Sequence, residues 1–199
     1  IGLPMGIQQT IMTSAYIVTT IIIAPLGTFA IAANSFGIIV ESLCYMPGYG
    51  VSDAATTLVG QSMGAGRYEL MKRFAWLSVA LGMGIMTVMG VVMYVGAPFA
   101  MAMMTPSEEV RQLGVEVLRI EAFAEPMFGA AIISYGVFVG AAKTIAPSVM
   151  NLISMWGVRI TLAAMLAPSM GLRGVWLAMC LELTFRGVIF LVKLTLWKR

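Results

Sequence analysis

Four acidic residues stand in long apolar segments of this sequence: Glu41, Asp53, Glu125 and Glu182. An ionised carboxylate at the depth of a lipid bilayer costs on the order of 2.5–3.5 kcal/mol on insertion scales. Sequences accept this cost where the acid has a partner, borders a water-filled cavity or exchanges protons. Because the chain contains no histidine, proton chemistry inside it would have to use carboxylates. These residues therefore indicate a membrane protein with a polar interior, which favours transport.

Glu41 and Glu125 are the strongest candidates for binding a substrate or an ion. Each lies near a proline, Pro47 or Pro126, that loosens its helix. A carboxylate beside a helix break can face a cavity together with unpaired carbonyl groups. Low-dielectric surroundings favour the protonated acid and a bound cation favours the ionised one, so proton and cation could compete for one site. The alternative is that each protonated acid only hydrogen-bonds a neighbouring carbonyl.

Asp53, Gln8 and Asn34 are weaker candidates for lining the same cavity. Asp53 could instead cap the continuation of its helix, and the two amides could hydrogen-bond between helices. Cys44 and Cys180 fall in apolar segments, where we expect buried thiols without a disulfide. With scattered acids and no histidine, the sequence predicts no metal site and no cofactor.

The apolar stretches predict six membrane spans, at residues 4–26, 29–63, 74–104, 121–142, 146–167 and 174–194, with a kink in the second. Hydrophobic residues make up 60% of the chain and charged residues 11%, against about 25% charged in soluble domains. Mean hydropathy is +0.93. A span needs roughly 20 helical residues. No hydrophilic linker interrupts the pattern, so residues 1–199 are expected to form a single all-α, polytopic transmembrane bundle.

Basic residues predict which side of the membrane each turn occupies. One side carries Arg67, Lys72, Arg73, Lys143, Lys193, Lys198 and Arg199. The opposite side carries Glu108 and Glu109, at the start of an amphipathic segment, 105–119, that is predicted to lie at the membrane interface with Glu121. The positive-inside rule places the basic side, and both ends of the chain, in the cytoplasm of a multi-pass cell-membrane protein. No basic stripe suited to nucleic acid is present.

Two further patterns concern helix packing. Glycines recur at four-residue spacing, as Gly2/Gly6, Gly60/Gly64 and Gly136/Gly140, which lets helices approach closely in a membrane. Arg159 and Glu182 lie about eight residues below the same ends of the fifth and sixth spans, or about 12 Å deep. A structural ion pair between them is predicted, with Arg186 sharing the carboxylate, and a gating or substrate role is the alternative.

An ordered set of short motifs resembles the C-terminal half of multidrug and toxic compound extrusion (MATE) transporters. The motifs are LVGQSMGAG at 58–66, Glu125-Pro126, GAAKT at 140–144, WGVRI at 156–160, GVWLA at 174–178 and Arg186-Gly187. The resemblance implies one six-helix lobe of a twelve-helix, alternating-access transporter whose N-terminal lobe is absent from this chain. It also implies that the partners are the lipid bilayer, a small organic substrate and that other lobe. The start at Ile1 without an initiator methionine fits part of a longer protein.

The resemblance also bears on coupling. In the NorM-like branch this lobe carries acids in its first and fourth helices, and those positions fall on Met12 and Phe128, which cannot bind a cation through a carboxylate. The DinF-like branch keeps its proton-coupling aspartate in the other lobe. The pattern therefore resembles the DinF-like branch more closely, which favours protons as the coupling ion, with sodium as the alternative.

The predicted function is secondary active export of organic, cationic or amphiphilic compounds in exchange for protons or sodium ions. One alternative is a flippase for lipid-linked saccharides from the same superfamily, whose cavity should be ringed by arginines. Another is a structural lobe that is inactive without its partner half. An enzyme is not expected, because the acids are scattered and no nucleophile–base pair or metal cluster is evident.

Overall fold

The structure is a computed structural model. It describes residues 2–197 and, within them, the side chains of residue 6 and residues 9–197. The regular elements of this part of the chain are all helical. In order they are α1 (Gly2–Ile23), η1 (Ala24–Leu26), α2 (Thr28–Gly64), α3 (Tyr68–Met104), α4 (Glu108–Glu121), α5 (Glu125–Gly140), α6 (Ile145–Leu152), η2 (Ile153–Ile160), α7 (Thr161–Met170) and α8 (Leu172–Thr195).

The helices confirm the predicted six-span membrane fold. Five are long and apolar enough to cross a membrane: Gln9–Leu26, Thr28–Gly64, Tyr68–Met104, Ile145–Met170 and Leu172–Thr195. Counted together as one broken span, α4 and α5 are the remaining one, fourth in chain order, with a bend of 59° at the break between them. Large apolar side chains cover the outside of the bundle, such as Leu77, Val95 and Phe99 on α3, which are 68–73% exposed. An apolar surface of this kind suits contact with lipid.

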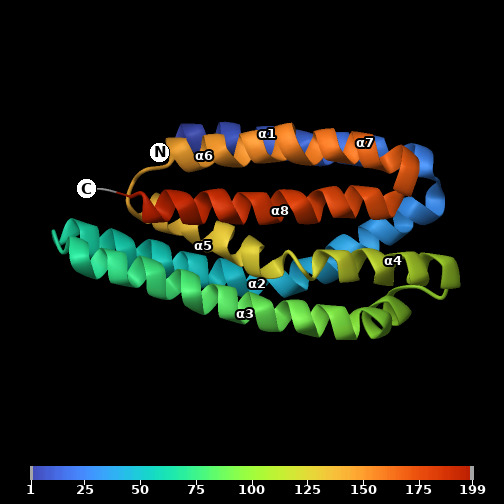
Figure 1. The fold of residues 1–199 in the computed structure, drawn as a ribbon, viewed down its shortest axis with the longest axis horizontal. Helices are drawn as coiled ribbons and strands as arrows, with labels where there is room; N and C mark the ends of the chain where they lie inside the picture. The colour runs from blue at the N-terminus through green and yellow to red at the C-terminus, as the bar shows by residue number, and fades with distance from the viewer. Residues whose placement is uncertain (1, 198–199) are drawn as a thin grey trace.

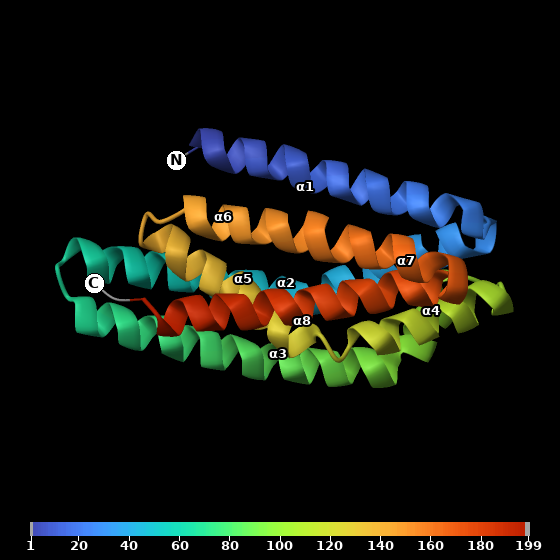
Figure 2. The same cartoon turned by 45° about the horizontal axis from the view of Figure 1, so that its top comes forward.

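The spans form an elongated bundle in which α8 lies between two groups of helices (Figure 1). On one side, α6, η2 and α7 form a single rod that packs beside α1. On the other side, α2, α3 and α5 pack together. Figure 2 shows α1 at the edge of the molecule, separated from most of α2. The space between these groups holds the cavities described below.

Basic turns gather at one end of the bundle, as the sequence predicts. The turn after α2, the turn after α5, the start of α1 and the end of α8 all lie at this end (Figure 1). Lys143 Nζ lies 5.3 Å from the ring centroid of Trp197, which joins two of these segments. At the opposite end Glu108 begins α4 and pairs with Arg111. Lys198 and Arg199 lie outside the described residues.

The predicted boundary of the fourth span is wrong. The sequence placed an interfacial helix before a span that begins at residue 121, whereas α4 is itself the outer arm of the span. It packs on α2, α3 and α8 through Val110, Val117 and Leu118. An amphipathic helix buries its apolar stripe against the bundle as readily as against a membrane surface. Glu121, expected at the interface, is consequently 1% exposed.

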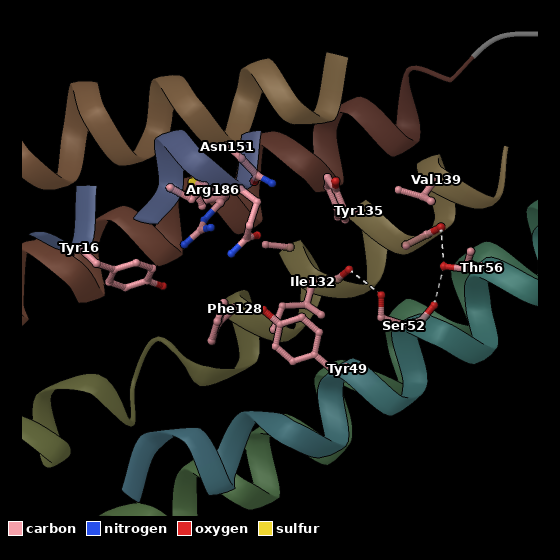
Figure 3. A pocket seen from close by; sticks show the side chains of 14 residues that line it. Tyr16, Tyr49, Ser52, Thr56, Phe128, Ile132, Tyr135, Val139, Asn151 and Arg186 are labelled. Carbon is pink, nitrogen blue, oxygen red and sulfur yellow. Dashed lines mark hydrogen bonds between the residues drawn. The ribbon is translucent and has the colours of Figure 1, made fainter. Parts of the chain in front are cut away.

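Contact between α2 and α5 depends on small residues, which confirms the packing role predicted for Gly136 and Gly140. Ser52 Oγ donates to the carbonyl oxygen of Ile132 at 3.0 Å, and Thr56 Oγ1 donates to that of Gly136 at 2.9 Å (Figure 3). A Cβ at either glycine would collide with α2. The two helices therefore meet backbone to side chain and form one wall of the main cavity described below.

Candidate functional site

A cavity of about 350 Å³ lies between α1, α2, α5, α6 and α8. Tyrosines, hydroxyls and amides form most of its polar surface: Tyr16, Tyr49, Tyr135, Ser52, Thr56, Gln9 and Asn151 (Figure 3). Among the lining residues that the structure describes, Arg186 is the one charged side chain, and none is acidic. This main cavity is thus an aromatic, hydrogen-bonding site with a single cation in its wall.

Arg186 is held by a neutralising partner on its own helix. Its Nη2 donates to Glu182 Oε2 at 3.1 Å, and its Nε lies 3.0 Å from Oε1 without the alignment of a hydrogen bond. Ser154 Oγ, from η2, donates to the same Oε1 at 2.5 Å. The guanidinium carbon of Arg186 stands 5.7 Å from the ring centroid of Phe128. Glu182 therefore has every oxygen bonded, and Arg186 reaches the cavity as half of an ion pair.

The predicted pair between Arg159 and Glu182 is not formed. Within residues 2–197, no carboxylate oxygen lies within 4.0 Å of Arg159. Its Nη2 instead donates to Met179 Sδ at 2.7 Å, and its guanidinium carbon lies 5.5 Å from the ring centroid of Tyr16. Residues four apart are neighbours on the same face of a helix, so Arg186 pairs with Glu182 within α8. Arg159 meets α8 three residues earlier, at Met179.

Arg159 borders a second, smaller cavity of about 80 Å³. This small cavity is lined by Tyr16, Thr19, Thr20, Asn34, Ile38, Arg159, Val175, Trp176 and Met179. Asn34 Oδ1 accepts a hydrogen bond from Trp176 Nε1 at 3.0 Å. Tyr16 lines both cavities and so forms the wall between them.

Two buried acids, Glu121 and Glu125, flank the break between α4 and α5, and a third, Glu41 of α2, interacts with both electrostatically. Glu125 is 0% exposed and both of its carboxylate oxygens lack a hydrogen-bond partner. Glu121 is 1% exposed with Oε2 unpartnered, and Glu41, on α2, is 7% exposed. The three carboxyl groups interact electrostatically with one another. Gly90 of α3 passes the break so closely that a Cβ there would lie 2.8 Å from the carbonyl oxygen of Ala122.

The buried acids do not line the main cavity. Neither Glu41 nor Glu125 is among its lining residues, whereas Phe128, one turn after Glu125 on α5, is. The structure therefore does not place the two predicted acids in a shared cavity. Glu121 is the member that the sequence prediction missed as a buried group. Its four-residue spacing from Glu125 was the available signal.

The remaining predicted residues are dispersed. Asp53 is exposed on α2, which continues without interruption, so it caps no helix. Asn34 lines the small cavity. The side chain of Gln8 lies outside the described residues, and its neighbour Gln9 lines the main cavity. Across the described part of the chain, no three His, Cys, Asp or Glu side chains are grouped so as to hold a metal ion.

A family model now places this arrangement among known proteins. The model described as MatE matches residues 4–165. The chain belongs to the MatE family. The main cavity, the small cavity and the buried acids are thus features of a MatE chain, and the multi-pass membrane fold agrees with that family.

Curated relatives of this MatE chain carry a name that refers to drug resistance. A protein from Xylella fastidiosa named "Probable multidrug resistance protein NorM" is 32% identical over 191 residues, covering 95% of this chain and 41% of the relative. A protein of the same name from Brucella suis is 29% identical over an alignment of 206 residues, covering 100% of this chain and 43% of the relative. The chain therefore spans less than half the length of these relatives.

Solved structures show the same fold. A MOP superfamily transporter from Pyrococcus furiosus matches with a TM-score of 0.91 and 17% identity, over 98% of this chain and 43% of that one. The MATE transporter VcmN from Vibrio cholerae matches with a TM-score of 0.90 and 17% identity, over 96% of this chain and 44% of that one. The described helices therefore correspond to one part of each longer MatE fold.

Two positions distinguish this lobe from the NorM-like pattern. Met12 and Phe128, where the sequence comparison places coupling acids of that branch, both line the main cavity. The relatives above nevertheless carry the NorM name, so they give no support to the expected closeness to the DinF-like branch. This MatE lobe combines NorM-named relatives with apolar side chains at both positions.

Proposed function

We propose that this chain forms one lobe of a secondary active exporter and that a second lobe completes the transport path. Family membership, the drug-resistance name of the relatives and the partial coverage of longer transporters support this proposal. In it, the lobe lies in the cell membrane with its basic end in the cytoplasm, as the positive-inside rule favours.

Glu125 carries the coupling part of the proposal. A carboxylate that is 0% exposed and has no hydrogen-bond partner is costly when ionised and far less costly when protonated. One such group suffices to bind a proton, so we propose protons, rather than sodium ions, as the coupling ion. Glu121 and Glu41 interact with it, and ionising any one of the three disfavours ionising the others. The total charge of these three acids thus depends on pH.

The main cavity supports amphiphilic organic compounds, including cations, as the proposed substrates. Its volume of about 350 Å³ is within the range of small-molecule sites, about 300–1,000 Å³. The faces of Tyr49 and Tyr135 can attract an organic cation without a carboxylate in the wall. Ionised acids at the break, one turn before Phe128, would strengthen this attraction and protonated acids would weaken it. Proton and cation binding then oppose each other, which is what exchange requires.

A pyrophosphate-lipid flippase fits this cavity less well. Such a substrate needs several positive charges, whereas Arg186 is the one charged group in the described lining and Glu182 already neutralises it. The geometry therefore favours an exporter over the flippase alternative.

Reconstituted transport tests the proposal. The full-length protein in proteoliposomes should move ethidium against its concentration gradient when a pH gradient is imposed. The substitutions Glu125→Gln and Glu41→Gln keep size and hydrogen bonding but remove titration, and Glu125→Gln should lower the gradient-driven rate at least about 10-fold. Glu116→Gln, at an exposed acid paired with Arg173, is the matched control and should not change the rate.

Three outcomes would overturn parts of this proposal. If both substitutions at the buried acids leave the rate at the parental value, the coupling role of the break is wrong. If a sodium gradient drives export and a pH gradient does not, protons are not the coupling ion. If neither gradient drives movement of cationic, neutral or anionic dyes, the chain does not belong to an exporter.

A further inference from the structure

Arg159 is the buried charge that the proposed function leaves without a purpose. Arg159 is 7% exposed, and its Nε has no hydrogen-bond partner. The thioether of Met179 is a weak acceptor, and the Tyr16 ring is a weak partner for a cation. Guanidinium groups stay protonated in proteins. Arg159 is therefore a positive charge that protein contacts compensate only in part.

The small cavity beside Arg159 contains a second hydrogen-bond donor. The indole N–H of Trp176 can only donate, so its 3.0 Å bond fixes the amide oxygen of Asn34 toward the indole. The amide NH₂ group of Asn34 is then left for the cavity. The hydroxyls of Thr19 and Thr20 donate to backbone carbonyls of their own helix, which directs their oxygen lone pairs, not their protons, outward. The polar donors of the site are thus Arg159 and Asn34, together with the phenolic hydroxyl of Tyr16 in the wall shared with the main cavity.

The size of the cavity restricts what can bind there. A volume of about 80 Å³ is the share of two or three water molecules at about 30 Å³ each. Ile38, Val175 and the ring of Trp176 form apolar walls. A small anion with weak hydration suits these donors in such surroundings, whereas a divalent or bulky anion does not.

We propose that the small cavity is a binding site for a monovalent inorganic anion of the size of chloride, held by Arg159 and Asn34. It lies apart from the main cavity and shares only the Tyr16 wall with it. The acids that interact electrostatically with Arg159 are Glu41 from α2 and Glu121 from α4. Neither lies within 4.0 Å of its guanidinium group, so the anion would add the direct partner that these acids do not provide.

Anion-dependent stability tests the site without any transport measurement. The full-length protein in detergent should unfold about 2–4 °C higher in 150 mM sodium chloride, bromide or nitrate than in sodium gluconate at the same ionic strength. Sodium sulfate is the control for general salt effects, because it stabilises proteins by exclusion from their surface. Crystals soaked in bromide should show an anomalous scattering peak within hydrogen-bond distance of Arg159.

Three substitutions distinguish an anion-binding role of Arg159 from a purely structural one. Arg159→Gln should abolish the difference between chloride and gluconate and the bromide peak, and Arg173→Gln, at the exposed arginine on α8, should keep both. Arg159→Lys retains the charge and should retain part of the shift. If the protein with Arg159→Gln does not fold, the anion series and the bromide peak of the parental protein still decide.

The proposal is overturned by equal melting temperatures in chloride and gluconate, by a chloride–gluconate difference that persists in Arg159→Gln, or by a bromide-soaked crystal without a peak at Arg159. Failure of the export proposal is a separate result. Glu125→Gln should abolish coupled export while leaving the chloride shift unchanged, and Arg159→Gln should remove the chloride shift in a protein that still exports.

Discussion

Two clusters of buried charge differ in how their charges are satisfied. One lies on α8 and the other at the break between α4 and α5, and both of these helices contact α8. On α8, the Glu182 carboxylate is bonded by Arg186 and by Ser154 of η2. At the break between α4 and α5, Glu125 has no partner for either oxygen and Glu121 has none for Oε2. Both clusters are almost fully buried. Burial alone therefore does not indicate a role: the bonded cluster joins α8 to η2, whereas our proposal assigns proton exchange to the cluster without partners.

The largest expected effect comes from breaking the satisfied cluster. Glu182→Ala should strand Arg186 in the interior and lower the free energy of unfolding by roughly 3–5 kcal/mol, the scale for breaking a buried pair. The double substitution Glu182→Leu/Arg186→Met removes both charges and should recover most of this loss. Thermal unfolding of the full-length protein measures both. A Glu182→Ala protein as stable as the parent would mean that the pair is not the structural element described here.

The opposite sign is expected at the unsatisfied cluster. Glu125→Leu replaces a buried group that has no partner, so it should raise the free energy of unfolding by about 1–3 kcal/mol while abolishing coupled export. Chemical denaturation and transport on the same preparation check the two parts. Loss of stability in Glu125→Leu would show that the carboxyl group has a partner in the native protein. The two clusters would then not differ in how their charges are satisfied.

An effect of similar size is expected at the contact between α2 and α5. Gly136→Ala places a methyl group against Ser52 and Thr56 of α2 and should cost about 1–3 kcal/mol through overpacking. Gly84→Ala is the matched control, since a Cβ there would meet nothing within 4 Å. Equal stability of the two variants would contradict the close α2–α5 contact.

The smallest effect is expected for the exposed ion pair between Arg173 and Glu116. Its side chains are 55% and 43% exposed, and pairs of this kind contribute about 0–1 kcal/mol. Glu116→Gln should therefore change the melting temperature little, in contrast to Glu182→Ala. If Glu116→Gln lowered the melting temperature as much as Glu182→Ala, buried and exposed ion pairs in this lobe would not differ in their contribution to stability.

The fold could largely be predicted from the sequence because composition and span length fix a membrane bundle. The helix break beside Glu125 could be predicted as well, because a carboxylate followed by proline in an apolar span indicates such a break. The depth of Glu121 could not, because the apolar stripe of α4 fits both a membrane surface and the packed bundle. Only packing against α2, α3 and α8 decides between them.

The partner of Arg159 was predicted wrongly for a different reason. Counting residues gives the depth of a side chain along a helix axis but not its rotation about that axis. Arg159 lies in η2, a π-helical segment at Ile153–Ile160, whose wider turn changes the direction of each side chain relative to an α-helix. Arg186 and Ser154 also reach Glu182 first. Sequence spacing does not contain the turn of η2 or the contact from Ser154, whereas the four-residue spacing of Glu182 and Arg186 did predict that Arg186 shares this carboxylate.

Proton release on substrate binding tests the central claim most directly. Ethidium added to the purified full-length protein in weakly buffered detergent solution should release protons, detected with a pH indicator dye, because a cation in the main cavity favours ionised acids at the break. Glu125→Gln should bind ethidium with little or no proton release, and Glu116→Gln should release as many protons as the parent. Undiminished release from Glu125→Gln would contradict the assignment of Glu125 as the proton-carrying group.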